Sequence, residues 1–159
     1  MTVRTTLLDA EVRSSLRALS AAAKRGFGDP ALAELVQIRA SQINHCAFCL
    51  DMHLAIARKH GVGEAQLDLL DAWEEAGDDV FDARERAALA LTEAVTVLTT
   101  GGTSGTRPGG GFVPAAVYER AARHFDDARL AHLIALITVI NSWNRLMVGR
   151  RIPPGSTEW

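Results

Sequence analysis

The chain has 159 residues, of which 48% are hydrophobic and 23% charged, as in an ordinary globular domain with its own apolar core. A net charge of −2 and a pI near 6.2 give no electrostatic reason to expect nucleic acid or an anionic membrane as a partner. The N-terminal residues lack the apolar segment of a signal peptide. The longest apolar run, Leu130 to Trp143, is too short and too polar to span a bilayer. We therefore expect a cytoplasmic protein with no membrane partner.

Apolar residues recur at spacings of three and four along almost the whole chain, which predicts an all-α fold. A first helix is expected from Leu8 to Arg25, with a stop at Gly26. The second begins with Asp29 as N-cap and Pro30 at its first helical position, and runs to about Ile43.

The third helix carries both cysteines of the chain. We expect Asn44 to cap this helix, His45 to begin it and His60 to end it, with Gly61 as the C-terminal stop. A short helix from Glu64 to Trp73 is expected to follow.

Three further helices are expected, from Asp82 to Leu98, from Pro114 to Arg123, and from Asp126 or Asp127 to Val148. The sequence "DARE" at 82–85 has the spacing of a capping box, with Asp in place of Ser or Thr. The last helix is the most apolar, which favours burial against another subunit as well as against its own core. The fold class expected is therefore a single-domain helical bundle of about six to seven helices.

Between Thr99 and Pro114 lies the low-complexity segment "TTGGTSGTRPGGGFVP", in which six residues are glycine. This composition predicts a flexible surface loop over about 100–113. Such a loop is either a tolerated insertion, which is the commoner case, or a lid over a site. Nothing else has the composition of a domain linker, so residues 1–159 are expected to form one domain.

The segment "INHCAFCLDMH", from Ile43 to His53, contains the features that indicate chemistry. Residues three and four apart share a helix face, so Cys46, Cys49 and His53 are expected along one stripe. Cys46 is predicted in the first turn, where free N–H groups and the helix dipole favour a thiolate. Cys49 lies four residues before His53, which places a base beside that thiol. The pair suits thiolate attack followed by closure of a disulfide.

His53 and Glu34 each have a second interpretation. A lone histidine facing the core is more often a structural residue, but the position of His53 beside Cys49 favours a base. An imidazole in that role needs a partner at its far nitrogen, and Glu34 on the preceding helix is a candidate. Most glutamates are simply exposed, and the spacing of Glu34 does not by itself decide the matter.

A metal centre and a thioredoxin-type site both have less support. The pattern C-x2-C-x3-H offers three ligands, but the sequence contains no second Cys/His cluster, so we expect no metal and no cofactor. A thioredoxin-type motif needs a βαβ context, which an all-α chain lacks.

The pattern E-x11-C-x2-C-x3-H, formed by Glu34, Cys46, Cys49 and His53, resembles the alkylhydroperoxidase D-like (AhpD-like) branch of the carboxymuconolactone decarboxylase superfamily. The segments "IRASQINHCAFCLDMHLAIARKHG", "ALALTEAVTVL" and "LIALITVINSWNRL" resemble the same branch. The resemblance covers about 32–153 and implies an all-α domain that assembles into dimers, trimers or hexamers.

The resemblance also implies peroxidase chemistry. Position by position, Cys49 matches the thiol that attacks the peroxide, Cys46 the partner that closes the disulfide, and His53 with Glu34 the proton relay. A hydroperoxide is then the substrate, and an external dithiol is the reductant. One departure is Phe48, which stands where the best-known peroxidase of the family has a second histidine.

Two classes of function follow. The first is a thiol peroxidase that works through a Cys46–Cys49 disulfide. The second is a non-peroxidase, either a γ-carboxymuconolactone decarboxylase-like enzyme or a redox-sensing oligomeric protein. The intact cysteine pair argues against the decarboxylase branch, whose members do not depend on a CxxC.

Overall fold

The computed structural model describes residues 2–4, 7–98 and 112–159. In these residues it contains seven α-helices, one short 3-10 helix and no strand, which confirms the all-α prediction. The α-helices are α1 Ala10–Phe27, α2 Pro30–Ile43, α3 Ala47–Lys59, α4 Glu64–Leu69, α5 Ala83–Thr96, α6 Ala115–Ala122 and α7 Asp127–Arg150. Most of the predicted Gly-rich loop at 100–113 lies outside the described residues.

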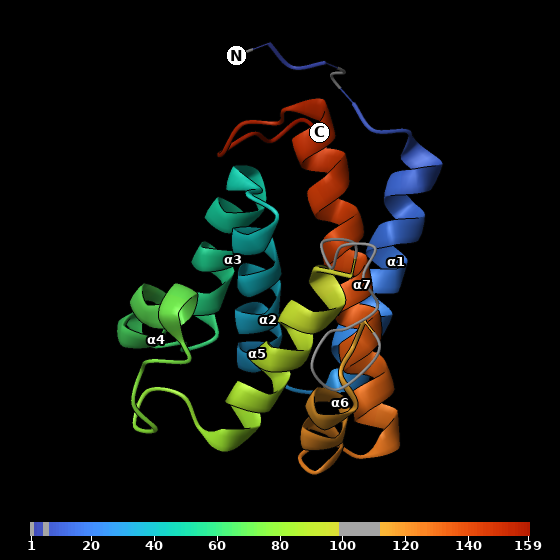
Figure 1. The fold of residues 1–159 in the computed structure, drawn as a ribbon. Coiled ribbons are helices and arrows are strands. Elements are labelled where there is room, and N and C mark those ends of the chain that lie inside the picture. The colour runs from blue at the N-terminus through green and yellow to red at the C-terminus, as the bar shows by residue number, and fades with distance from the viewer. Residues whose placement is uncertain (1, 5–6, 99–111) are drawn as a thin grey trace.

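Helix α2 is the centre of the bundle. It packs against α3, α5 and α7, while α1 lies along α7 on the far side (Figure 1). Because α2 has neighbours on several sides, it buries polar residues such as Glu34 and Gln37 together with its apolar ones. A polar side chain placed there must find its partners inside the protein.

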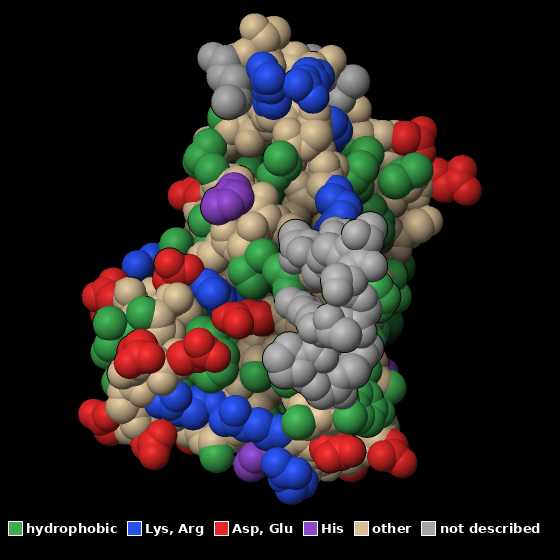
Figure 2. All heavy atoms as spheres, viewed as in Figure 1, with side chains coloured by type: hydrophobic (Ala, Val, Ile, Leu, Met, Phe, Trp, Pro, Cys, Tyr) green, Lys and Arg blue, Asp and Glu red, His purple; other side chains and the backbone are tan. Residues whose placement is uncertain are grey.

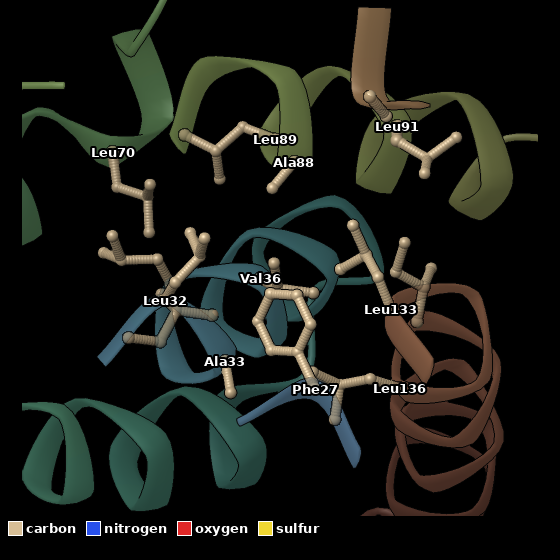
Figure 3. Close-up of a cluster of buried hydrophobic side chains, with 14 of the residues drawn as sticks. Phe27, Leu32, Ala33, Val36, Leu70, Ala88, Leu89, Leu91, Leu133 and Leu136 are labelled. Atoms are coloured by element: carbon tan, nitrogen blue, oxygen red, sulfur yellow. The ribbon is translucent and has the colours of Figure 1, made fainter. Parts of the chain in front are cut away.

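The main core lies between α2, α5 and α7 (Figure 3). Phe27, at the end of α1, sits among leucines that α2 and α7 contribute. The labelled core side chains are Phe27, Leu32, Ala33, Val36, Leu70, Ala88, Leu89, Leu91, Leu133 and Leu136. A smaller apolar cluster, Cys46, Phe48, Cys49, Met147 and Ile152, lies where α3 begins and α7 ends.

Three predicted helix starts are confirmed by their capping bonds. Asp29 caps α2 and accepts from the Leu32 N–H at 3.0 Å. Asp82 and Glu85 form the full capping box of α5. Asp126 caps α7 by accepting from the Arg129 N–H at 2.8 Å. Each carboxylate satisfies an N–H that the first helical turn leaves without a partner.

The end of α1 was predicted wrongly. The helix continues through Gly26 to Phe27 and stops at Gly28, which adopts a left-handed φ of 72°. Gly26 has a different reason to be glycine, because a Cβ there would clash with the His132 ring of α7. Its bare backbone lets α1 approach α7 closely.

Three other helices end two or more residues away from the predicted position, and one of them is α5, which ends at Thr96 and not at Leu98. The helix predicted to reach Trp73 changes after Leu69 into a 3-10 turn over Leu70–Ala72. Helix α7 runs to Arg150, two residues beyond the predicted end. Arg151 then takes a left-handed φ of 58° and closes the helix by hydrogen-bonding to Val148.

Helix α7 is long and apolar enough, by length and composition alone, to cross a membrane. The apolar run noted in the sequence is thus part of a longer helix. Leu130, Leu133 and Ile137 of this helix are nevertheless buried in the protein core. Its contacts are those of a bundle's core helix.

The surface carries charges of both signs. On the face shown in Figure 2, acidic side chains gather around α4 at lower left, and basic side chains lie near them. This mixture agrees with the net charge of −2.

The core makes a direct stability prediction. Leu136 is fully buried, so Leu136→Ala should lower the free energy of unfolding by about 2–5 kcal/mol through lost contacts and a cavity. Leu69 is 41% exposed, and Leu69→Ala should cost no more than about 0.5 kcal/mol. Urea denaturation of both variants checks the difference, and equal losses would contradict the described core.

Candidate active site

The junction between α2 and α3 fixes the position of Cys46. His45 adopts a left-handed φ of 54°, and the N–H groups of His45 and Cys46 bond to the carbonyls of Gln42 and Ser41. This is a Schellman motif that closes α2, so the predicted helix start at His45 is wrong. Asn44 ends α2 and does not cap α3.

Cys46 itself is the N-cap of α3. Its Sγ accepts from the Cys49 N–H at 3.3 Å. Cys46 and Cys49 are joined in a disulfide with Cα atoms 5.3 Å apart, and each residue is 1% exposed. The N-cap position replaces the predicted place in the first turn, and it still exposes the Cys46 sulfur to the free N–H groups of the helix start.

The Asn44 side chain anchors this junction to α7. Its amide donates to Asn141 and to Asn144, at 2.9 Å in each case. Asn144 donates in turn to the Ser41 hydroxyl at 3.0 Å. Because these side chains are largely buried and bonded to one another, the residues before Cys46 have little freedom to move.

His53 lies one turn after Cys49 and is 4% exposed. Its Nδ1 is 2.7 Å from Oε2 of Glu34, which is 1% exposed. A carboxylate can only accept, so Nδ1 carries the proton in this bond. In a neutral ring the basic nitrogen is therefore Nε2.

The Glu34 carboxylate has two further partners on its other oxygen. Lys24 from α1 lies 2.7 Å from Oε1, and Gln37 donates to the same oxygen at 3.0 Å. Burial alone would raise the pKa of Glu34, but the bonds and charges of His53 and Lys24 outweigh it, so the pKa is lowered from its usual 4.5. Glu34 is therefore a fixed anion at neutral pH.

A cavity of about 340 Å³, here called the Cys49 cavity, has both Cys49 and His53 in its wall. Lys24 and Gln37 also line it. Most of the remaining wall is apolar and includes Phe48, Met52, Ile56, Ile140, Trp143 and Trp159. The cavity thus brings a sulfur and an imidazole together in a largely apolar space.

Trp159 reaches the Cys49 cavity from the segment that follows α7. Its ring meets Phe48 and Trp143 edge-on, with centroids 5.6 and 5.4 Å apart, and lies under the Arg17 guanidinium. The Trp159 carbonyl accepts from Arg13 at 3.1 Å. Figure 1 shows this segment passing over the end of the bundle where α3 begins.

The structure brings together all four residues singled out in the sequence: Glu34, Cys46, Cys49 and His53. Sequence reasoning missed Lys24, Gln37 and Trp159. Gln37 follows Glu34 by one turn and could have been found from helix spacing. Lys24 and Trp159 had no such signal, because their contacts depend on how α1 and the last residues pack.

No three His, Cys, Asp or Glu side chains gather as metal ligands within residues 2–4, 7–98 and 112–159. The two sulfurs, which would be the best ligands, are bonded to each other. His53 already holds Glu34 through Nδ1, which leaves a single nitrogen for any other partner.

Known proteins resemble this chain in sequence and in fold. The sequence model of the carboxymuconolactone decarboxylase family matches residues 10–94, which are more than half of the chain. The chain belongs to the carboxymuconolactone decarboxylase family. Within it, the all-helical fold and a structural neighbour place the chain in the alkylhydroperoxidase D-like branch.

Three known proteins are similar to this chain over most of its length. The uncharacterized protein YdfG of Bacillus subtilis (strain 168) is 39% identical over 115 residues, which span 72% of this chain and 70% of YdfG. The uncharacterized protein YnjA of Escherichia coli (strain K12) is 33% identical over 131 residues, which span 82% of this chain and 64% of YnjA.

The third relative is a solved structure. It is a protein of unknown function from Agrobacterium tumefaciens, for which a role as the antioxidant defence protein AhpD has been suggested. The two folds superpose with a TM-score of 0.82 and 29% identity, covering 96% of this chain and 99% of the other. The two proteins therefore share one fold over nearly the whole chain.

The lowered pKa of Glu34 predicts how stability changes with pH. Since the folded-state pKa lies below the unfolded value of about 4.5, Glu34 stabilises the fold fully above that pH. This contribution is lost as the pH falls through the folded-state pKa. Glu34→Gln should therefore be less stable at neutral pH and lose less stability on acidification.

Urea denaturation at several pH values between 7 and 3 measures how the free energy of unfolding of each protein changes with pH. Asp29 also has a lowered pKa and is unchanged in the variant, so some acid dependence should remain. Parallel curves for wild type and Glu34→Gln would show that Glu34 is not a stabilising anion in the folded protein.

Proposed function

We propose that the protein is a thiol peroxidase that reduces hydroperoxides through a Cys46–Cys49 disulfide cycle. The observation that carries the proposal is that Cys49 and His53 line the same cavity while Glu34 holds Nδ1 of His53. This arrangement leaves Nε2 as a base beside a thiol, which is what activates a cysteine nucleophile. Membership of the alkylhydroperoxidase D-like branch supports the same chemistry.

The first step uses the reduced protein. His53 Nε2 takes the Cys49 proton, and the thiolate attacks the outer oxygen of the hydroperoxide. The O–O bond breaks, the alkoxide takes the proton from the imidazolium and leaves as an alcohol, and Cys49 becomes a sulfenic acid. Cys49 is thereby oxidised and the peroxide reduced by two electrons.

The second step closes the disulfide. The Cys46 thiol attacks the sulfenic sulfur of Cys49, the S–O bond breaks, and water leaves. The 5.3 Å separation of the two Cα atoms is within the usual range for a disulfide. An external dithiol then returns both cysteines to thiols, and the dithiol is oxidised.

Glu34 has a narrower role in this scheme than the end of a relay. Its lowered pKa makes it a poor acceptor for a proton at neutral pH. The carboxylate instead orients the His53 ring and stabilises its charged form when the ring holds the Cys49 proton. Lys24 keeps the carboxylate ionised and is itself only partly exposed.

The apolar wall of the Cys49 cavity favours an organic hydroperoxide with a hydrocarbon group. Phe48, Met52 and Trp143 offer contacts to such a group, which hydrogen peroxide cannot use. Phe48 stands where the best-known peroxidase of the family has a second histidine. In this protein the Phe48 ring packs against Trp159. His53 is therefore the proposed base without a second imidazole between the cysteines.

The second candidate is the decarboxylation for which the family is named, and the family match is what favours it. The substrate of that reaction carries carboxylates, and these need unpaired cations in the site. Lys24 is already bonded to Glu34, and Arg17 lies over the Trp159 ring. The mostly apolar cavity therefore gives this candidate less support than the peroxidase.

The expected oligomer, cytoplasmic location and external dithiol remain part of the proposal. Helix α1 supports assembly, because Val12 and Leu19 are 45% and 46% exposed on it. Apolar side chains two turns apart on one helix form a stripe that a second copy could cover.

Substitutions at the site separate the proposed roles. Cys49→Ser should abolish dithiol-dependent hydroperoxide consumption, because it removes the attacking sulfur. His53→Gln should lower the rate by about 10²–10⁴-fold through loss of the base. A coupled peroxidase assay with cumene hydroperoxide measures both, and normal turnover by Cys49→Ser would rule out the mechanism.

The fate of the sulfurs gives an independent check. One equivalent of hydroperoxide added to the reduced protein should remove the mass of two hydrogen atoms, mapped to Cys46 and Cys49. Cys46→Ser should instead retain one added oxygen on Cys49, because the resolving thiol is missing. Mass spectrometry after rapid quenching checks this, and unchanged wild-type thiols would favour a non-peroxidase.

A further inference from the structure

The disulfide lies between two cavities. The second, of about 270 Å³, is here called the Cys46 cavity, and it is lined by Cys46 but not by Cys49. The Cys49 cavity is lined by Cys49 but not by Cys46. Phe48 and Met147 contribute to both linings, so these two side chains form the wall that separates the cavities.

We propose that the Cys46 cavity is the binding site for the external reductant, a slender and largely apolar dithiol that attacks the Cys46 sulfur. The inference rests on the proposed function in one respect, that the Cys46–Cys49 disulfide is turned over. The peroxide and the reductant would then reach the cysteine pair through different cavities.

The geometry of thiol–disulfide exchange supports this entry. An attacking thiolate approaches one sulfur along the S–S axis, from the side opposite the sulfur that leaves. Of the two cysteines, Cys46 lines the Cys46 cavity and Cys49 does not. A nucleophile that enters this cavity therefore attacks Cys46 and expels Cys49. Attack on Cys49 through the Cys49 cavity would compete with the substrate and its alcohol product.

The first exchange step leaves the protein ready for the next peroxide. The reductant thiolate forms a bond to Cys46 Sγ, the Cys46–Cys49 bond breaks, and Cys49 departs as a thiolate. Cys49 lies in the wall of the cavity that His53 shares, so its thiolate is released beside the imidazole, in the state that attacks the next peroxide. The product is a mixed disulfide between Cys46 and the reductant.

The second exchange step uses the N-cap position of Cys46. The remaining thiol of the reductant loses its proton to water and attacks, as a thiolate, the reductant sulfur bound to Cys46; a cyclic disulfide forms, the bond to Cys46 breaks, and Cys46 leaves as a thiolate. The Cys49 N–H, which already donates to Cys46 Sγ at 3.3 Å, stabilises that anion. A dithiol completes this step within one molecule, whereas a monothiol needs a second molecule to bind.

The lining of the Cys46 cavity indicates the chemistry of the reductant. Val148, Ile152, Pro153 and Pro154 make most of it apolar. His45 and Arg151 add the polar atoms, and no acidic side chain is among the described residues that line it. A thiolate is therefore attracted and not repelled on its way to Cys46.

Two matched tryptophan substitutions test the division between the cavities. Val148 lines only the Cys46 cavity and Ala21 only the Cys49 cavity, and both residues are exposed, so a larger side chain should leave the fold intact. Protein oxidised with diamide, and not with peroxide, is reduced with dithiothreitol. The thiols are counted after acid quenching.

Val148→Trp should slow reduction by dithiothreitol roughly tenfold or more, since exchange depends on access to the sulfur. It should leave the single-turnover oxidation of reduced protein by cumene hydroperoxide nearly unchanged. Ala21→Trp should slow the oxidation by cumene hydroperoxide and leave the reduction by dithiothreitol nearly unchanged. The inference would be overturned if dithiothreitol reduced Ala21→Trp more slowly than wild type and reduced Val148→Trp at the wild-type rate.

An experiment on the wild-type protein keeps the test independent of the variants' folding. The alcohol product of cumene hydroperoxide should slow oxidation and should not slow reduction of the diamide-made disulfide. Equal slowing of both would show that the reductant shares the Cys49 cavity. If hydroperoxide fails to oxidise the protein at all, the proposed function falls, while the dithiothreitol rates still decide where the reductant enters.

Discussion

The buried carboxylate of Glu34 is the interaction on which the site depends. It joins three helices, since Lys24 comes from α1, Glu34 and Gln37 from α2, and His53 from α3. A buried charge is costly unless every lone pair finds a partner, so these helices must pack in one arrangement to satisfy it. The same arrangement fixes which nitrogen of His53 is free to act as a base.

The cysteine pair depends on a second constraint, at the start of α3. The left-handed His45 ends α2 and turns the chain so that Cys46 caps the next helix within two residues. Asn44 ties this turn to α7. The disulfide is therefore held between a rigid corner and a helix, with one of its two cysteines lining each cavity.

Sequence patterns were sufficient for what depends on local spacing. The helical periodicity, the caps at Asp29 and Asp82, and the placement of His53 one turn after Cys49 all follow from distances along the chain. They were insufficient where tertiary contacts decide. Lys24 and Glu34 come from different helices. Trp159 reaches the cavity from the segment after α7 and bonds to Arg13 of α1. The need for glycine at position 26 arises from His132 on α7.

The central claim is that Glu34 activates Cys49 through His53. The most direct test is the rate at which Cys49 reacts with cumene hydroperoxide across pH in a Cys46→Ser background, with Glu34→Gln compared against Lys24→Met. If the claim holds, Glu34→Gln loses most of the rate at neutral pH and recovers it only where the free thiol ionises, while Lys24→Met keeps the larger part. A Glu34→Gln profile that coincides with that of its parent would contradict the account.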